Sequence, residues 1–434
     1  MEATARNHPR IMAHVERNWA GNYTYAAARL YHPATLHEVR ELVRNSRAIR
    51  VLGSRHSFNG IADSTEDLVS LSRLDQVVDL DRDRRTVTIQ GGMRYGQLGQ
   101  FLHANGFALP NLASLPHISV AGACATATHG SGEGSGNLAT SVVAMDILSP
   151  DGDVISLSRA THAEFDGMVV SLGALGVIVG MTLDVVPTFN VRQDVYEHLS
   201  LEAVAQGFDA IQESAYSVSL FTNWTHECFD QLWLKRVGDV DELGDIFHGA
   251  RRAPENRHPI AGISAQSCTP QMSDAGAWHD RLPHFRMEFT PSSGEELQSE
   301  YFVPRRYAVD ALRAMMQLGH RIAPLLLVSE VRTIAADTLW LSPCYEQSTM
   351  ALHFTWKPDW NAVRALIPDI ESALAPFAAR PHWGKLFTMA PAEVSARYRR
   401  MADFKRLLLA YDPAGKFRNA FVESFLAGII PTDQ

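Results

Sequence analysis

The sequence predicts an α+β protein built from two domains. At 434 residues, the chain is longer than one hydrophobic core ordinarily serves. The first 190 residues contain short β-branched runs that end at glycine or polar clusters, whereas from about residue 195 helical stretches alternate with strands. We therefore expect a strand-rich first domain, followed by a second domain in which helices flank a sheet.

Strands and turns make up most of the predicted first domain. Runs rich in β-branched residues, closed by glycine, proline or polar clusters, indicate four strands, over 48–53, 67–71, 85–92 and 174–187. Alternating residues on both sides of "SPDG" predict a hairpin over 142–158. Apolar residues at helical spacing, with Gly106 as the stop, predict a helix over 95–106.

The second half has a different pattern of predicted elements. Helical stretches over 202–215 and 305–319 alternate with strands over 217–224 and 350–357. Residues 237–300 are rich in proline, histidine, glycine and charge, so long loops are expected there. A final helix is predicted over 391–410.

Composition excludes several classes of protein. The chain is 46% apolar and 20% charged, as soluble globular proteins are, and its net charge of −9 lacks the basic character of a nucleic-acid binder. No segment has the apolar length of a signal peptide or a membrane span. The four cysteines, at 124, 228, 268 and 344, are too far apart for a zinc site or a disulfide framework. We expect a cytoplasmic protein, with no metal and no membrane partner.

A run of small residues over 109–136 points to a ligand. Its glycines, alanines and serines let a backbone approach a bound group and present N–H groups to an anion. A flexible surface loop is the ordinary alternative, but the run begins with the apolar "LPNLASLPHISV" and contains His129. It matches neither GxGxxG nor the P-loop, and no GxSxG occurs, so any nucleotide binds outside those schemes.

The turn "GSRHSFNG" places a histidine, His56, where the turn itself needs only small residues. Polar residues also share strand faces further on. Glu330 and Arg332 in "VSEVRTI" are two residues apart, as are His353 and Thr355 in "ALHFTWK", so each pair lies on one side of its strand. The residues alone leave two interpretations open, a ligand-binding wall or an exposed sheet face with ordinary salt bridges.

Three motifs carry a family resemblance. "VLGSRHSFN", "LPNLASLPHISVAGACATATHGSG" and "SLGALGVIVGMTL" resemble the FAD domain of the vanillyl-alcohol oxidase flavoprotein superfamily, and "HFTW", "ARPHWGKLF" and "DPAGKFRNAF" extend the resemblance to the alditol oxidases of its aldonolactone oxidoreductase branch. The resemblance implies a two-domain vanillyl-alcohol oxidase-type fold. Its parts are a PCMH-type FAD-binding domain (1–190), a substrate or cap domain with a mixed or antiparallel sheet flanked by helices (191–380), and a C-terminal segment that completes the active site (381–434).

The resemblance also implies a cofactor, FAD, bonded covalently through His56. A neutral imidazole is a suitable nucleophile for the flavin methyl carbon. Arg55 stands where the similar enzymes have glycine. The sequence alone does not establish how tightly the turn closes around an arginine. The implied cofactor residues are Val51, Leu52, Gly53, Ser54, Arg55, His56, Ser57, Ser114, Ser119, Gly122, Thr126, Ala127, Thr128, His129, Val177 and His382.

The implied reaction is oxidation of the terminal hydroxyl of a sugar alcohol such as xylitol or sorbitol, with hydride transfer to flavin N5 and reduction of O2 to H2O2. By resemblance, the substrate is bound by Ser114, Glu330, Arg332 and Thr355, beside His353 and Lys385. We favour His353 as the base, with Lys385 and Arg332 as electrostatic partners, and Lys385 is the alternative base. His279 and His284 are interpreted as structural.

Two other functions remain as alternatives. A lactone oxidase or dehydrogenase of the same branch, acting on L-gulono- or galactono-lactone, would share the turn and the "HWGK" motif. A non-catalytic carbohydrate-binding relative would lack flavin. The expected partners are a polyol and O2, and the expected state is a monomer.

Overall fold

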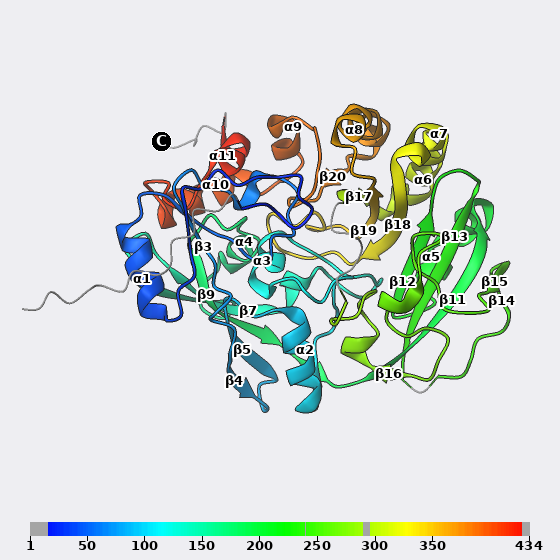
Figure 1. Cartoon of the computed structure of the whole chain (residues 1–434), viewed down its shortest axis with the longest axis horizontal. Coiled ribbons are helices and arrows are strands. Elements are labelled where there is room, and N and C mark those ends of the chain that lie inside the picture. The colour runs from blue at the N-terminus through cyan, green and yellow to red at the C-terminus, as the bar shows by residue number, and fades with distance from the viewer. Residues whose placement is uncertain (1–15, 239, 290–295, 428–434) are drawn as a thin grey trace, which may run out of the picture.

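The computed structural model describes residues 16–238, 240–289 and 296–427. Figure 1 shows two lobes side by side, with the N-terminal half of the chain in one lobe and a large twisted sheet in the other. The described helices and strands form an α+β architecture, as predicted. No described helix is long and apolar enough to cross a membrane.

The first lobe contains two main sheets. A three-stranded parallel sheet has the order β1 (Arg29–Tyr31), β3 (Asp67–Val69), β2 (Ile49–Val51). A five-stranded antiparallel sheet has the order β4 (Val77–Asp81), β5 (Thr86–Gln90), β9 (Val177–Asp184), β7 (Val142–Leu148), β8 (Val154–Ser158). The hairpin predicted over 142–158 is the β7–β8 pair. Two short strands, β6 (Phe107–Ala108) and β10 (Val186–Pro187), pair separately.

Four helices accompany these sheets. They are α1 (Leu36–Asn45), α2 (Tyr95–Ala104), α3 (Val120–Ala125) and α4 (Phe165–Met168). Helix α2 confirms the helix predicted over 95–106, and it buries Tyr95, Leu98 and Leu102 against the first-lobe core. Helix α1 begins after Thr35, whose hydroxyl accepts a hydrogen bond from the Glu38 amide and so satisfies a free donor of the first turn.

The second lobe is built on one antiparallel sheet. Its main order is β14 (Ile246–Phe247), β15 (Ala250–Arg252), β11 (Asn190–Ser200), β13 (Cys228–Val237), β12 (Ser217–Thr222), β18 (Leu326–Ile334), β19 (Thr349–Trp356), β17 (Leu297–Pro304), β20 (Arg380–Pro381), and β16 (Gly276–Ala277) pairs with β11. Four helices lie near it, α5 (Leu201–Gln212), α6 (Ala308–Gln317), α7 (Gly319–Ile322) and α8 (Trp360–Leu374). Residues of all four share one apolar cluster with the sheet, so they cover one of its faces.

The C-terminal segment returns to the first lobe. The helix expected over 391–410 is two helices, α9 (Pro391–Ala396) and α10 (Met401–Tyr411), and α11 (Ala420–Leu426) follows. The break falls where the Tyr398 ring packs on Trp383, with ring centroids 4.9 Å apart, which turns the chain between the two helices. All three helices contribute to the first-lobe core (Figure 1).

The loop between β18 and β19 also reaches into the first lobe. Leu339, Trp340, Leu341 and Tyr345 belong to the same apolar cluster as the first-lobe strands, and so does Trp278. The two lobes are therefore packed together through several segments of the second. The division into 1–190, 191–380 and 381–434 remains our proposed domain assignment.

Arg50, buried on β2, ties three segments of the first lobe together. Its guanidinium donates to the carbonyl oxygens of Gly173 (2.9 Å), Leu172 (2.7 Å), Phe417 (2.6 Å) and Ile61. Burial lowers its pKa to about 10, so the side chain stays charged at neutral pH.

Replacing Arg50 with methionine removes a donor from each of these carbonyl oxygens, and Ile61 keeps only a longer contact with Asn419 (3.3 Å). We expect Arg50→Met to lower the free energy of unfolding by about 3 kcal/mol or more, measured by urea denaturation. Arg47→Met is the matched control, because Arg47 pairs with Glu66 while its side chain is 87% exposed, and its loss is expected to change stability little. Equal midpoints for the two variants would contradict the anchoring role of Arg50.

Candidate active site

A large cavity lies between the two lobes. It is lined by the turn after β2, by the small-residue run before and along α3, and by the face of the second-lobe sheet that the helices leave uncovered. Fourteen of the residues expected to hold the cofactor line it: Val51, Leu52, Gly53, Ser54, Arg55, His56, Ser57, Ser114, Ser119, Gly122, Thr126, Thr128, His129 and His382. The six expected substrate-site residues, Ser114, Glu330, Arg332, His353, Thr355 and Lys385, line the same cavity.

Two expected cofactor residues do not line the cavity. The side chain of Val177 packs into a separate apolar cluster with Val39 and Val43, and its neighbours Gly176 and Ile178 line the cavity instead. Ala127 is fully buried in the first-lobe core at the turn that ends α3. Their role in cofactor binding stays a prediction.

His56 is held at the cavity wall as a neutral imidazole. Its ring stacks on Trp19, with centroids 5.4 Å apart, and its Nδ1 is buried with no hydrogen-bond partner in the protein. Burial lowers the pKa of His56 to about 4. A neutral ring with an unpartnered nitrogen is suited to bond a group inside the cavity.

Arg55 adopts a backbone conformation that favours glycine. Its φ of +64° lies in the left-handed region, which costs a non-glycine residue roughly 1 kcal/mol. Two contacts hold it there: its carbonyl oxygen accepts from the Trp19 amide (2.8 Å), and its guanidinium pairs with Glu16 at 2.5 Å. The turn thus closes in the left-handed conformation although it has arginine at this position.

Small residues pack the adjacent wall closely. A Cβ on Gly53 or on Gly122 would lie 2.7 Å from the Ser119 hydroxyl oxygen, so neither position tolerates a side chain without movement. The Ser119 amide in turn donates to Ser54 Oγ (3.1 Å). This contact joins the histidine turn to the start of α3, and together they form one side of the cavity.

On the opposite side, the sheet register aligns three polar residues. Glu330 on β18 and Glu300 on β17 are both directly opposite His353 on β19. Because facing residues of paired strands point to the same side, the three side chains form a row across the cavity wall. Behind that wall, Leu352, Phe354 and Trp356 belong to the helix-covered core, as the alternation in the sequence predicted.

Glu300 is the centre of a buried charge cluster. Its carboxylate accepts from Arg332 Nη2 (2.9 Å) and Lys385 Nζ (2.7 Å), and His129 Nε2 lies 3.2 Å away at an angle that forms no hydrogen bond. Burial alone would raise the pKa of Glu300, but the charges of Lys385, His129 and Arg332 outweigh it and hold the pKa well below the usual range. Glu300 is therefore an anion that balances part of the positive charge of the site.

Lys385 also joins His353. Its Nζ lies 2.7 Å from His353 Nδ1, and His353 Nε2 lies 3.1 Å from Thr355 Oγ1. Burial and the nearby Lys385 charge lower the pKa of His353 to about 4, so its ring is neutral at ordinary pH. Burial also lowers the pKa of Lys385, although Glu300 opposes the shift.

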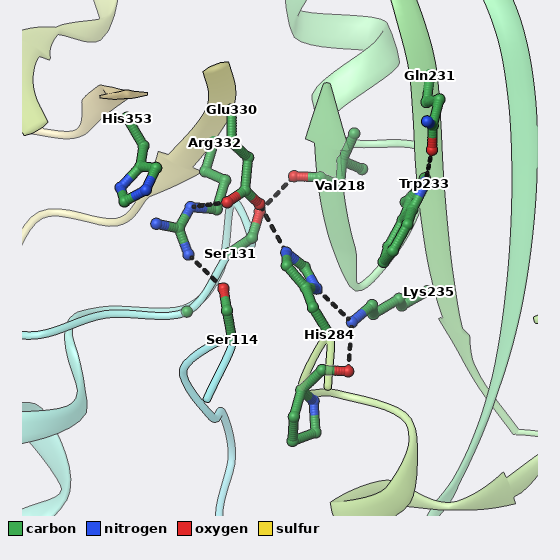
Figure 2. A network of polar contacts seen from close by, with 12 residues as sticks. Ser114, Ser131, Val218, Gln231, Trp233, Lys235, His284, Glu330, Arg332 and His353 are labelled. Atoms are coloured by element: carbon green, nitrogen blue, oxygen red, sulfur yellow. Dashed lines mark hydrogen bonds and ion pairs between the residues drawn. The ribbon is translucent and has the colours of Figure 1, made fainter. Parts of the chain in front are cut away.

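Arg332 links this wall to the first lobe. Its Nη1 donates to Ser114 Oγ at 3.3 Å, and its Nε has no hydrogen-bond partner although it is buried (Figure 2). Glu330 Oε2 lies 3.5 Å from that Nε. Burial would raise the pKa of Glu330, but the charge of Arg332 and the contact with His284 keep it far below the usual range. Both residues therefore present ionic groups to the cavity.

Sequence reasoning missed Glu300, and its interpretation of His284 as structural was incomplete. His284 Nε2 lies 2.7 Å from Glu330 Oε1, and its ring lines the cavity. Glu300 could have been found, because Gln298 and Glu300 are two residues apart on β17, as Glu330 and Arg332 are on β18, so each pair shares one strand face. His284 sits in a loop without periodicity, so no sequence signal placed it.

The cavity suits a large polar cofactor together with a small polar substrate. His56 Nδ1 is buried at its wall with no partner among the described residues, whereas His129 Nε2 and Arg332 Nε each lie near a carboxylate. Buried polar groups in proteins are normally paired, so an unpartnered atom such as His56 Nδ1 indicates a bound group. The described residues contain no cluster of His, Cys, Asp or Glu able to hold a metal ion.

Comparison with known proteins agrees with this geometry. Residues 27–158 match the model of an FAD binding domain, and residues 289–425 match that of D-arabinono-1,4-lactone oxidase. The chain is 47% identical to an alditol oxidase from a Streptomyces species, covering 95% of this chain and 99% of that protein. It is 27% identical to L-gulono-1,4-lactone dehydrogenase from Mycobacterium tuberculosis, covering 96% and 100%.

The fold is also shared with a solved structure. The solvent-stable cholesterol oxidase superposes with a TM-score of 0.78 at 15% identity, over 98% of this chain and all of the other. Together, the fold, the cavity and the matches define an FAD-dependent oxidoreductase that acts on CH–OH groups. Within that class, the chain belongs to the alditol oxidase family, in the aldonolactone oxidoreductase branch of the vanillyl-alcohol oxidase flavoproteins.

The charge balance around Glu300 predicts a specific defect. Glu300→Gln keeps the shape of the side chain but leaves Arg332 and Lys385 undercompensated, so we expect substrate-driven flavin reduction to slow at least about 100-fold while FAD stays bound. Stopped-flow absorbance of the flavin measures the rate.

Glu371→Gln is the matched control for this variant. Glu371 is also a buried carboxylate, but its partners are Tyr301 and Thr388, and it does not line the cavity. We expect Glu371→Gln to lose stability and keep its reduction rate. Equal reduction rates in both variants would remove Glu300 from the reaction.

Proposed function

We propose that this protein oxidises the terminal hydroxyl of sugar alcohols to the aldose, using FAD bonded to His56 and O2 as the acceptor. The observation that carries the proposal is the row of ionic and hydroxyl side chains, Glu330, His353, Glu300 and their partners, facing the cavity that the His56 turn also lines. The 47% identity to an alditol oxidase over nearly the whole chain supports it.

The first-lobe wall would hold the cofactor. The unpartnered Nδ1 of His56 is the nitrogen available for a covalent bond, and the small residues around Ser119 allow a ring system to approach the backbone. When bound there, FAD would supply the acceptor for the hydride of the carbinol carbon, with O2 as the final acceptor and H2O2 as the product. The chain's own residues supply binding, orientation and proton transfer.

The second-lobe wall suits a molecule made of hydroxyl groups. Glu330 accepts hydrogen bonds from hydroxyls, Arg332 donates in a rigid fork, and Ser114 and Thr355 do either. A polyol offers a donor and an acceptor at every oxygen, so it can pair with each of these groups. A misfit substrate that leaves one buried group unpaired loses about 1–3 kcal/mol of binding.

His353 is proposed as the base, with Lys385 as its hydrogen-bonded partner. Burial lowers the pKa of Lys385, which favours its uncharged form. With Lys385 uncharged, the ring hydrogen of His353 lies on Nδ1 and is directed at Nζ, so the Nε2 lone pair is free beside Thr355 to accept the substrate hydroxyl proton. The imidazolium that forms lies 3.5 Å from the Glu300 carboxylate, which stabilises it. Arg332 provides a fixed positive charge next to the developing alkoxide.

The proposal extends to the state of the chain. The large apolar side chains exposed among the described residues, such as Val78, Ile246 and Ile263, are few, which supports a monomer. All four cysteines are unpaired, which supports a reducing compartment such as the cytoplasm.

Covalent attachment is tested at His56. Denatured wild-type protein is expected to retain yellow flavin fluorescence on a gel, and His56→Ala to release its FAD because no other imidazole with a free nitrogen lies in this turn. His103→Ala is the control, since His103 bonds Thr188 outside the cavity. Fluorescence retained by denatured His56→Ala would place the link elsewhere.

The substrate class is tested by anaerobic flavin reduction with a panel of compounds. We expect xylitol and sorbitol to reduce the flavin with kcat/KM at least about 100-fold above that of L-gulono-1,4-lactone, because the lactone replaces two hydroxyl donors with a carbonyl and a ring oxygen that only accept, and its ring prevents the extended shape of a polyol. In air, one H2O2 per polyol is expected. Reduction by lactones alone would identify a lactone oxidoreductase, and a colourless preparation would identify a non-catalytic relative.

A further inference from the structure

A buried lysine lies beside the substrate wall, on the same face of the sheet, and takes no part in the mechanism described so far. Lys235 on β13 is 1% exposed, and no carboxylate of the described residues bonds it directly. Figure 2 shows Lys235, His284 and Glu330 connected in sequence, from the centre of the sheet to the cavity.

The ammonium group of Lys235 has three N–H donors and three acceptors. They are the carbonyl oxygens of Leu282 (2.5 Å) and Pro283 (3.1 Å), and His284 Nδ1 (3.1 Å). Because both carbonyls only accept, a protonated Lys235 must donate its third hydrogen to His284 Nδ1. That nitrogen therefore carries the lone pair.

The tautomer of His284 then determines how it meets Glu330. A neutral ring that accepts at Nδ1 carries its hydrogen on Nε2, and this N–H donates to Glu330 Oε1 at 2.7 Å. Burial lowers the pKa of His284 to about 4, so the ring is neutral. The opposite tautomer would place a lone pair against the carboxylate, and Glu330 would have to turn away or take up a proton.

We propose that Lys235 is a positioning residue that fixes the His284 tautomer and so holds Glu330 as an oriented anion for the hydroxyl groups of the substrate. The choice of substrate rests on the proposed function, but the tautomer does not. The other charged or titratable groups that act on Lys235 are Glu330 and Arg332 from β18 and Cys268 from a neighbouring loop. Its cross-strand neighbours, Gln193 and Ser217, do not titrate.

The arrangement gives a pH dependence. Burial lowers the pKa of Lys235 to about 7, although Glu330 opposes the shift. Above that pH the lysine loses its third hydrogen, the ring hydrogen moves to Nδ1, and Glu330 loses its donor. We therefore expect the KM for the polyol to be lowest below pH 7 and to rise as pH increases through about 7, while kcat changes less.

The first test uses Lys235→Met in the FAD-loaded enzyme. At pH 6, KM is expected to rise about tenfold with kcat changed less than about threefold, and KM should then be flat from pH 6 to 8.5. Lys416→Met is the matched control, because Lys416 also donates to two carbonyl oxygens, of Val43 and Pro150, far from the substrate wall. A wild-type pH profile retained by Lys235→Met would overturn the proposal.

The second test needs neither substrate nor the variant of Lys235. Histidine-labelled wild-type enzyme at pH 6, studied by long-range ¹H–¹⁵N spectra, should contain a ring with protonated Nε2 and bare Nδ1 whose signals vanish in His284→Gln. Protonated Nδ1 in that ring would overturn the proposal. Should no polyol reduce the wild-type flavin, the proposed function fails, while this spectrum still reports on Lys235 and His284.

Discussion

The active-site wall depends on one buried carboxylate, Glu300. Arg332 and Lys385 point into the same cavity, and two cations removed from water in one site would repel each other by several kcal/mol without an anion between them. Glu300 supplies that anion, and its position opposite His353 in the β17–β19 register determines where both cations sit. The positions of the Lys385 ammonium, of the Arg332 guanidinium and of His353 between them therefore follow from the placement of a single carboxylate in a sheet.

Residues of both lobes form the site, and hydrogen bonds join the lobes there. Arg332 bonds the Ser114 hydroxyl, while the Ser114 carbonyl oxygen accepts from the His284 amide at 3.0 Å. Arg332 and His284, the two partners of Glu330 in the network of Figure 2, therefore both contact the small-residue run of the first lobe. A change in how the lobes pack would move the substrate wall relative to the His56 turn. The C-terminal helices and the β18–β19 loop pack into the first-lobe core, and these contacts hold the two walls of the cavity in position.

Much of this arrangement could be predicted from the sequence. The parts that could not be predicted depend on contacts between distant segments. Period-two alternation predicted which side chains share a face on β18 and β19, and helical spacing predicted α2. Both patterns are local, because they depend only on which side chains of one element face the core. The resemblance located the His56 turn. Lys235 could not be found, because a lysine on a strand is ordinarily exposed, and its burial here depends on acceptors from residues 282–284, far along the chain. Ion pairs between neighbouring strands likewise cannot be predicted until the strand order and register are known.

The site contains two lysine–histidine pairs, and the two lysines differ in their other hydrogen-bond partners. Lys385 bonds a carboxylate as well as His353, so a proton can move within that group while Glu300 balances the charge. Lys235 bonds only carbonyl oxygens and His284, and Glu330 is reached through the ring. Carbonyl oxygens cannot take up a proton at ordinary pH, so the second pair holds its hydrogens in place as long as the lysine stays charged. In the proposed mechanism, the first pair takes up the proton of the substrate hydroxyl, and the second pair keeps an acceptor oriented beside it.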